Sequence, residues 1–249
     1  MSPPPGPRMI SLVRYETPPG PCGYLAGKTW RFEHELVAAL SPAEYEQRLK
    51  HGWRRFGHVL FRPICPGCSA CQSLRVDVQR FRPNRSQRRN RKLNEGAVRL
   101  TIGSPAVSRA KLDLYDRYHA FQSATKDWPG HEPKDVAEYR DTFVNNPNPV
   151  EEWQYTLAGR LVGIGYVDRV PNGLSAIYFF YDPAERDRGL GTWNVLSVIQ
   201  RAAALGLPHV YLGYHVAGSA SLEYKANFGP NEMLGPDGVW RDVPGQSGG

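Results

Sequence analysis

The chain has 249 residues and a formal net charge of +7, enough sequence for one large domain or two small ones, each with its own core. No run of about 18 apolar residues is present, and the first residues lack the apolar segment of a secretory signal. These features argue against a membrane protein and predict a cytoplasmic one. In that reducing compartment, four cysteines are expected to be metal ligands or reactive thiols.

The positive charge is concentrated between residues 80 and 92. This segment holds seven of the 31 Lys and Arg residues and no acidic residue, and the 24 basic residues left outside it equal the 24 Asp and Glu of the chain. Stability alone would favour mixed charges, so the segment predicts a surface that attracts a polyanion such as nucleic acid. The alternative is a solvated helix face. The seven residues are Arg80, Arg82, Arg85, Arg88, Arg89, Arg91 and Lys92.

Cysteines form a second local pattern. Cys65, Cys68 and Cys71 are spaced as C-x-x-C-x-x-C, which lets one tight loop turn three thiolates toward a common centre. Cys22 is the only other cysteine, and a fold that returns it to this loop would complete a four-thiolate site for zinc or an iron–sulfur cluster. The alternative is three buried structural thiols and a solitary fourth. Thiolate ligands alone do not separate the two metals.

Four segments follow from local composition and turn-forming residues. We expect a disordered tail over residues 1–19, an N-terminal domain with the cysteine loop and the basic segment over 20–104, a second domain over 105–240, and a flexible tail over 241–249. The boundary between the two domains lies in a link that contains Pro and Ser, at residues 103–108.

Secondary structure follows from caps, turns and apolar periodicity. Ser41 and Glu44 have the spacing of a capping box before a helix that stops at Gly52, and Ser86 is the expected cap of the basic helix. Helices are expected at residues 42–51, 87–95, 108–125, 134–144 and 221–228. Extended chain or strands are expected at residues 53–63, 74–78, 153–157, 161–167, 174–181 and 209–214.

A strand, a polar loop and an apolar helix follow one another between residues 174 and 205. Gly189 and Gly191 in the loop let backbone N–H groups approach an anion at the start of the helix, close to Arg186. The order resembles the R/Q-x-x-G-x-G/A loop of the GNAT acyltransferase fold, which grips the pyrophosphate of acetyl-CoA. The resemblance implies an α/β (α+β) fold in which a GNAT-like domain with a mixed sheet follows a smaller cysteine-containing domain. A loop without a ligand is the alternative.

Several short motifs are spread over residues 20 to 235. They are Cys22-Gly23-Tyr24-Leu25, Gly52-Trp53-Arg54-Arg55-Phe56-Gly57, the cysteine loop, the basic run from Ser86 to Arg91, Tyr178-Phe179-Phe180-Tyr181-Asp182-Pro183, Gly189-Leu190-Gly191-Thr192, Tyr211-Leu212-Gly213-Tyr214 and Tyr224-Lys225-Ala226-Asn227-Phe228. Together they resemble the aminoacyl-tRNA–protein transferases. The resemblance is closest to the bacterial branch, the aspartate/glutamate leucyltransferases of the N-degron pathway. Leu25 is a departure, because the eukaryotic arginyltransferases carry another cysteine there.

The resemblance implies an enzyme that transfers an aminoacyl group, above all Leu, from aminoacyl-tRNA to the N-terminal α-amine of proteins that begin with Asp or Glu. The product would be an N-degron, and no ATP is needed because the ester is already activated. Aminoacyl-tRNA is both an acyl ester and a polyanion, so one substrate accounts for the glycine loop and the basic segment. Two other classes stay open: a CoA-dependent GNAT N-acetyltransferase, and a nucleic-acid-binding zinc module without catalysis.

Roles for individual side chains follow from this interpretation. Asp182 is expected to orient or deprotonate the amine, and Tyr181 or Tyr214 to handle the leaving ribose oxygen, although Asp-Pro also opens turns and strand tyrosines are often core. The acidic side chain of the acceptor needs a cation, and Arg75 and Lys225 are the candidates, each with a surface role as the alternative. The residues expected to bind aminoacyl-tRNA are Arg88, Arg89, Arg91 and Lys92 at its backbone and Arg186, Gly189 and Gly191 at its acyl-bearing 3′ end.

Overall fold

The computed structural model describes residues 8–126, 128, 130–219 and 221–243. Within these ranges, the largest unit is an eight-stranded mixed sheet in which only β11 and β12 run parallel. The expected α/β class with a mixed sheet is therefore confirmed. In spatial order the strands are β14 (Trp240–Asp242), β13 (Asn231–Leu234), β7 (Gln72–Asp77), β12 (His209–His215), β11 (Gly173–Tyr181), β10 (Arg160–Val170), β9 (Val150–Leu157) and β8 (Val98–Gly103).

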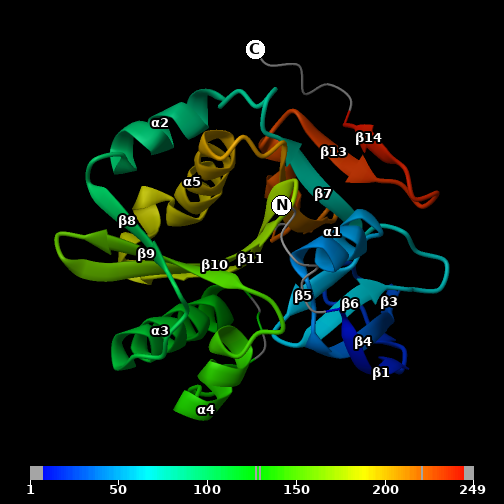
Figure 1. Cartoon of the computed structure of the whole chain (residues 1–249). Coiled ribbons are helices and arrows are strands. Elements are labelled where there is room, and N and C mark those ends of the chain that lie inside the picture. The colour runs from blue at the N-terminus through cyan, green and yellow to red at the C-terminus, as the bar shows by residue number, and fades with distance from the viewer. Residues whose placement is uncertain (1–7, 127, 129, 220, 244–249) are drawn as a thin grey trace, which may run out of the picture.

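Helices cover both faces of this sheet (Figure 1). Adjacent residues of β11 supply the two faces: Phe179 packs in the cluster that contains α5, and Phe180, fully buried, packs in the cluster that contains α3. The alternation of strand side chains therefore divides the core into two layers. The helices are α2 (Arg85–Asn94) and α5 (Leu190–Ala204) on one face, and α3 (Arg109–Thr125), α4 (Val136–Tyr139) and the π-helical turn η1 (Arg140–Val144) on the other.

A second, four-stranded sheet is built from the N-terminal part of the chain. The capping box is present, with the Glu44 amide donating to Ser41 Oγ at 3.3 Å, so the expected first helix is confirmed. The apolar side of this helix buries Tyr45 and Leu49 in one cluster with Trp53. In spatial order the strands are β1 (Ile10–Glu16), β4 (Phe32–Ala39), β6 (Val59–Pro63) and β5 (Arg54–Phe56), accompanied by α1 (Pro42–Lys50) and the short pair β2 (Gly20–Pro21) and β3 (Thr29–Trp30).

The two sheets do not divide at the expected domain boundary. Strands β7 and β8 precede residue 104 but belong to the eight-stranded sheet, so a division at 104/105 would cut that sheet. A buried ion pair also joins the sheets, because Arg55 on β5 donates from Nη2 to Asp168 Oδ1 on β10 at 2.7 Å and from Nε to Oδ2 at 3.1 Å. The link that contains Pro and Ser is only the short connection between β8 and α3.

The expected tails are also shorter than the sequence suggested. Residues 10–16 form β1 and pair with β4, although the Pro-rich start predicted a tail over 1–19. At the other end, residues 240–242 form β14, where a tail over 241–249 was expected. β1 is held by pairing with β4, and β14 by a hairpin with β13, and the composition of the chain ends reports neither pairing. Residues 1–7 and 244–249 lie outside the described residues.

Most other expected elements are present with adjusted ends. The strands expected between residues 153 and 214 are β9 to β12, and the expected helix at 108–125 is α3. The basic helix begins at Arg85, because Asn84 rather than Ser86 is its N-cap and Gln87 completes the capping box. The last expected helix is the short 3₁₀ helix η3 (Glu223–Asn227). In the part of the chain that the structure describes, no helix combines the length and apolar character needed to cross a membrane.

Candidate active site

The parallel strands β11 and β12 separate soon after they meet. They pair only between residues 173–175 and 209–211, and β12 continues in pairing with β7 on its other side. The β12–β7 ladder is irregular between Tyr211 and Gly213, and Gly213 has a φ of 85°. A bulge with a glycine at positive φ bends a strand. Beyond Ser175, the β11 edge that faces β12 therefore has no strand partner within the described residues.

The loop after β11 has the geometry expected of an anion site. The 3₁₀ helix η2 (Pro183–Arg188) leads to Gly189, whose φ of 60° lies in the left-handed region, and α5 begins at the next residue. A Cβ at Gly189 would lie 2.7 Å from Asn90 Nδ2, whereas one at Gly191 would meet open space. The start of α5 has no side-chain cap, and the Arg186 side chain is 61% exposed. The loop thus offers N–H donors, the positive end of a helix and a cation.

Helix α2 holds this loop from one side. Asn90 Nδ2 donates to the carbonyls of Arg188 and Gly189 at 2.9 and 3.1 Å, and Asn94 Nδ2 donates to the Arg188 carbonyl at 2.9 Å. Gln87, two turns before Asn94 on the same face, is also buried. The inner face of α2 therefore holds the glycine loop by hydrogen bonds from Asn90 and Asn94, an arrangement we call the clasp.

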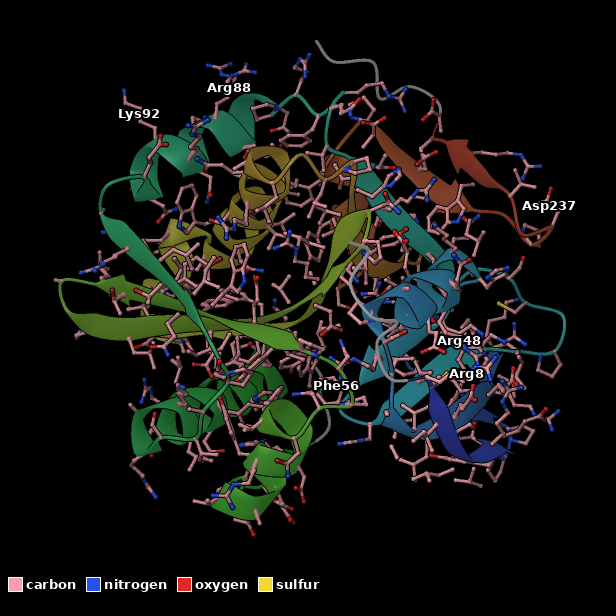
Figure 2. All side chains as sticks on the ribbon, in the orientation of Figure 1. Arg8, Arg48, Phe56, Arg88, Lys92 and Asp237 are labelled. Carbon is pink, nitrogen blue, oxygen red and sulfur yellow. The ribbon has the colours of Figure 1, made fainter. Side chains whose placement is uncertain are left out.

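The outer face of α2 carries the basic residues. Arg88 and Lys92 project away from the body of the protein (Figure 2), and Arg85 and Arg89 are exposed as well. None of these four side chains forms an ion pair with a carboxylate among the described residues. Arg91 differs from the other expected tRNA contacts, because it pairs with Glu95 at 2.8 Å.

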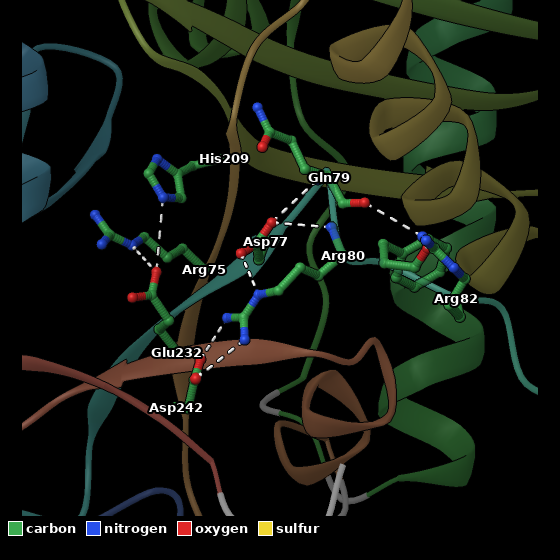
Figure 3. Close-up of polar contacts among 9 residues, drawn as sticks. Arg75, Asp77, Gln79, Arg80, Arg82, His209, Glu232 and Asp242 are labelled. Carbon is green, nitrogen blue, oxygen red and sulfur yellow. Dashed lines mark hydrogen bonds and ion pairs between the residues drawn. The ribbon is translucent and has the colours of Figure 1, made fainter. Parts of the chain in front are cut away.

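Two other members of the basic segment are engaged within the protein. Arg80 donates from Nε to Asp77 Oδ2 and from Nη2 to Asp242 Oδ1, both at 2.6 Å (Figure 3). Arg82 Nη1 donates to the carbonyls of Gln79 and Phe81 at 3.2 and 2.8 Å. Arg80 is thus neutralised by two carboxylates, whereas Arg82 keeps its charge, so most of the unpaired charge of the segment lies on α2.

Asp182 supports the loop. Its Oδ1 accepts a hydrogen bond from the Ala184 amide at 3.1 Å, and its Oδ2 lies 3.5 Å from both Arg117 Nη2 and Arg160 Nη1. The residue is 7% exposed and caps η2. The turn-opening alternative for Asp182 is thus confirmed, and its carboxylate already accepts hydrogen bonds from Ala184 and Arg117 and forms an ion pair with Arg160.

The two expected catalytic tyrosines lie in different surroundings. Tyr214 donates its hydroxyl to the carbonyls of Gly52 and Phe61 at 2.9 and 3.2 Å, so this hydroxyl is tied to the smaller sheet and is not free for a leaving oxygen. Tyr181 is half-buried, with its ring centroid 5.2 Å from that of Tyr118, and burial raises its pKa. Its hydroxyl forms no hydrogen bond in the part of the chain that is described, so Tyr181 keeps a free donor.

The two expected acceptor-binding cations also differ. Arg75 Nε donates to Glu232 Oε2 at 2.7 Å (Figure 3), and its guanidinium lies 4.4 Å from the ring centroid of Trp240. The charge of Arg75 is thus matched inside the protein. Lys225 Nζ donates to the Tyr214 carbonyl at 2.9 Å and forms no ion pair among the described residues. Burial, and then the charge of Arg54, lower the pKa of Lys225 to about 7.

Arg54 is the site residue that the sequence did not single out. It is 6% exposed, and its Nη2 donates at 3.0 Å to the carbonyl of Ala176, the first β11 residue beyond the pairing with β12. The sequence places Arg54 beside Arg55, whose charge is matched by Asp168. No local pattern separates the paired arginine from the unpaired one.

The four cysteines are free and half-buried. The Cys22 and Cys65 sulfurs each accept a hydrogen bond from a backbone amide at 3.4 Å. Burial, and then the charges of Cys65, Cys22 and Cys68, raise the pKa of the Cys71 thiol to about 11, so Cys22 returns to within electrostatic reach of the loop. Within the described ranges, no three His, Cys, Asp or Glu side chains are grouped closely enough to hold a metal ion. The four-thiolate centre therefore stays a prediction.

Comparison with known proteins connects this geometry to a reaction. Residues 20–89 match the family model described as "Arginine-tRNA-protein transferase, N terminus", and residues 110–235 match the corresponding "C terminus" model. Aspartate/glutamate leucyltransferase from Campylobacter jejuni is 36% identical over 216 residues, 86% of this chain and 89% of the relative. The enzymes of that name from Halorhodospira halophila and Chromobacterium violaceum are 36% and 34% identical, over 88% and 95% of this chain and 92% and 96% of the relatives.

Among solved structures, L-PGS from Bacillus licheniformis has a TM-score of 0.47 and 12% identity over 80% of this chain and 63% of its own. The matches to family models and curated relatives define the class: the chain is an aminoacyltransferase. More particularly, it belongs to the arginine-tRNA-protein transferase family, as the distributed motifs predicted.

Proposed function

We propose that this enzyme transfers leucine from leucyl-tRNA to the N-terminal α-amine of proteins that begin with Asp or Glu, creating an N-degron in the cytoplasm. The names of its relatives support this reaction. The observation that carries the proposal is the double role of α2, whose outer face presents unpaired cations while its inner face clasps the glycine loop. An aminoacyl-tRNA offers a polyanionic backbone and an acyl-bearing end in one molecule. Acetyl-CoA would leave the outer face of α2 unused.

In the proposed reaction, the amine nitrogen attacks the ester carbonyl carbon of the aminoacyl-tRNA. The C–N bond forms, the C–O bond to the ribose breaks, and the amine proton ends on the ribose oxygen. An α-amine has a reference pKa of about 7.7 to 8.0, so little help is needed to deprotonate it. Backbone N–H groups on the free edge of β11 are suited to stabilise the oxyanion, and Tyr181 has a free hydroxyl to donate to the leaving oxygen.

We also propose that the C-terminal part of the chain is a GNAT-like acyltransferase unit. Two features support this: the separation of β11 from β12, and the left-handed Gly189 that starts α5. In this proposal Arg186, Gly189 and Gly191 bind the 3′ end of the charged tRNA, with backbone N–H groups at the start of α5 as the donors.

A transfer assay tests the proposed function. Peptides that differ only in their first residue, Asp, Glu, Asn, Gln or Ala, are incubated with labelled leucyl-tRNA, arginyl-tRNA or acetyl-CoA. We expect label to pass from leucyl-tRNA to the Asp and Glu peptides without ATP. Label arriving only from acetyl-CoA would establish the N-acetyltransferase alternative, and label from neither tRNA would overturn the proposal.

We propose that Cys22, Cys65, Cys68 and Cys71 together bind zinc or an iron–sulfur cluster. Four soft thiols on two segments fit either group, and both Cys22 and Cys65 already accept backbone N–H groups of the kind that stabilise thiolates. When bound, the group would tie residues 22–25 to the cysteine loop.

Protein purified without oxygen is expected to contain stoichiometric zinc or iron, and Cys71→Ser is expected to remove it and lower the melting temperature. Elemental analysis and absorbance spectra provide the measurement. Four thiols that react fully with a labelling reagent in metal-free, stably folded protein would contradict the proposed site.

A further inference from the structure

Two cations meet beside Gly213, where β12 bends away from β11. A Cβ at Gly213 would lie 3.4 Å from Lys225 Nζ, 3.5 Å from Arg54 Nη2 and 3.6 Å from Arg54 Nε. Gly213 has no such atom, so the two charged groups flank the position that a side chain would occupy. Arg54 comes from β5 and Lys225 from η3, so three distant segments of the chain create this arrangement.

These cations lack the partners that buried charges normally have. Arg54 is almost fully buried, and neither it nor Lys225 forms an ion pair with a carboxylate in the residues that the structure describes. Each donates instead to a backbone carbonyl, Arg54 to Ala176 and Lys225 to Tyr214. Buried charges without counter-ions are costly, and proteins keep them where a ligand supplies the opposite charge. Burial, and then the charge of Arg54, lower the pKa of Lys225, in agreement with this cost.

The position of the pair indicates which ligand it serves. Ala176 and Tyr214 lie on β11 and β12, the two strands that separate, so Arg54 and Lys225 each contact one of these two strands beyond their pairing. The phosphates of the tRNA are accounted for by α2 and the glycine loop. A carboxylate has the size and charge to bind between one guanidinium and one ammonium group.

We propose that Arg54 and Lys225 bind the acidic side chain of the first residue of the acceptor protein. This inference rests on the proposed function and adds Arg54 as a specificity residue. The two cations hold Asp or Glu with charge-assisted hydrogen bonds, while Asn or Gln leaves the cations without a counter-ion. Placing the side chain there holds the adjoining α-amine near the free β11 edge, where the ester carbonyl is to be attacked.

The test compares Asp and Asn peptides in enzymes with altered Arg54. Because a charge-assisted hydrogen bond to a buried partner is strong, Arg54→Met is expected to lower kcat/KM for the Asp peptide by about 10- to 100-fold. The Asn peptide should be affected much less, so the Asp/Asn ratio falls. Arg54→Lys should restore part of the ratio, and Lys225→Met should lower it independently. If Arg54 had a purely structural role, Arg54→Met would reduce kcat/KM for both peptides equally. Arg169 is an exposed cation on β10, and Arg169→Met is the control, which should keep the Asp/Asn ratio of the wild type.

The outcomes separate this inference from the proposed function. If the wild type transfers leucine to Asp and Glu peptides but Arg54→Met and Lys225→Met both keep the full Asp/Asn ratio, the assignment of Arg54 and Lys225 is wrong. The proposed reaction is then unaffected. If the wild type transfers leucine to no peptide, the proposed function itself fails. Binding of an Asp or Asn dipeptide to folded protein, measured by calorimetry, gives a second readout: Asp should bind the wild type more tightly than Arg54→Met. Equal Asp binding by the two proteins would also overturn the inference.

Discussion

Replacing Arg88, Arg89 and Lys92 together with alanine is expected to weaken binding of charged tRNA and flatten its dependence on salt. Arg88 and Lys92 project from α2 (Figure 2) and Arg89 is exposed, and none of the three forms an ion pair with a carboxylate among the described residues. Arg88 Nη1 donates to the Pro83 carbonyl at 2.6 Å, which leaves its charge available to a phosphate. Removing one phosphate-binding cation lowers the magnitude of the log–log salt slope by about 0.7 to 0.9, so the triple variant should lower it by roughly 2 to 3. Fluorescence anisotropy with tRNA over a salt series measures both quantities.

A matched triple variant tests whether position matters or only net charge. Lys126, Arg140 and Arg169 are also exposed but lie outside α2, and replacing them with alanine removes the same charge. This control should keep most of the slope. An equal reduction in both triple variants would mean that tRNA feels only the overall charge, and an unchanged slope in the α2 variant would make its outer face an ordinary solvated surface.

Asp168→Ala is expected to lower the stability of the protein strongly. It leaves the Arg55 guanidinium, whose side chain is 1% exposed, without the carboxylate that now binds it through two nitrogens. Removing one partner of a buried ion pair costs about 3 to 5 kcal/mol. Unfolding by urea, followed by circular dichroism, should show a lower midpoint.

Two controls distinguish the buried pair from ordinary surface charge. Asp113 pairs with Arg109 on the surface of α3, and Asp113→Ala should change the free energy of unfolding by less than about 1 kcal/mol. The double variant Arg55→Met with Asp168→Leu removes both charges and should recover most of the stability. A small effect of Asp168→Ala would show that the two sheets are held together by other interactions.

Local signals predicted local structure well in this chain. The spacing of Ser41 and Glu44 predicted α1, and the glycines after the strand at 174–181 predicted a loop that leads into a helix, which is α5. Both depend on residues a few positions apart. The basic helix was also predicted, but its cap was misplaced, because Asn84 and Ser86 both suit that position and only the pairing of Asn84 with Gln87 decides between them.

Pairing between distant strands was not predictable from such signals. β7 lies between β12 and β13, which come from the far end of the chain, so a division near residue 104 looked natural in the sequence but cuts the sheet. For the same reason the sequence offered Arg75, and not Arg54, as an acceptor-binding cation. Arg75 is neutralised by Glu232 on β13, whereas Arg54 meets no carboxylate in the described ranges, and only the fold reveals the difference.

In the proposed function, the clasp between α2 and the glycine loop fixes the distance between the two places where the tRNA binds. The cations on the outer face of α2 and the Asn90 and Asn94 side chains, which donate to the loop carbonyls of Arg188 and Gly189, belong to one helix of ten residues, so their separation is fixed. A free aminoacyl nucleotide can reach only one side. A charged tRNA in the proposed pose engages both, and its second contact is then intramolecular, with a high effective concentration. In this pose the enzyme prefers charged tRNA over short acyl esters without contacts to the bases, because only the tRNA is long enough to bind at both faces of α2.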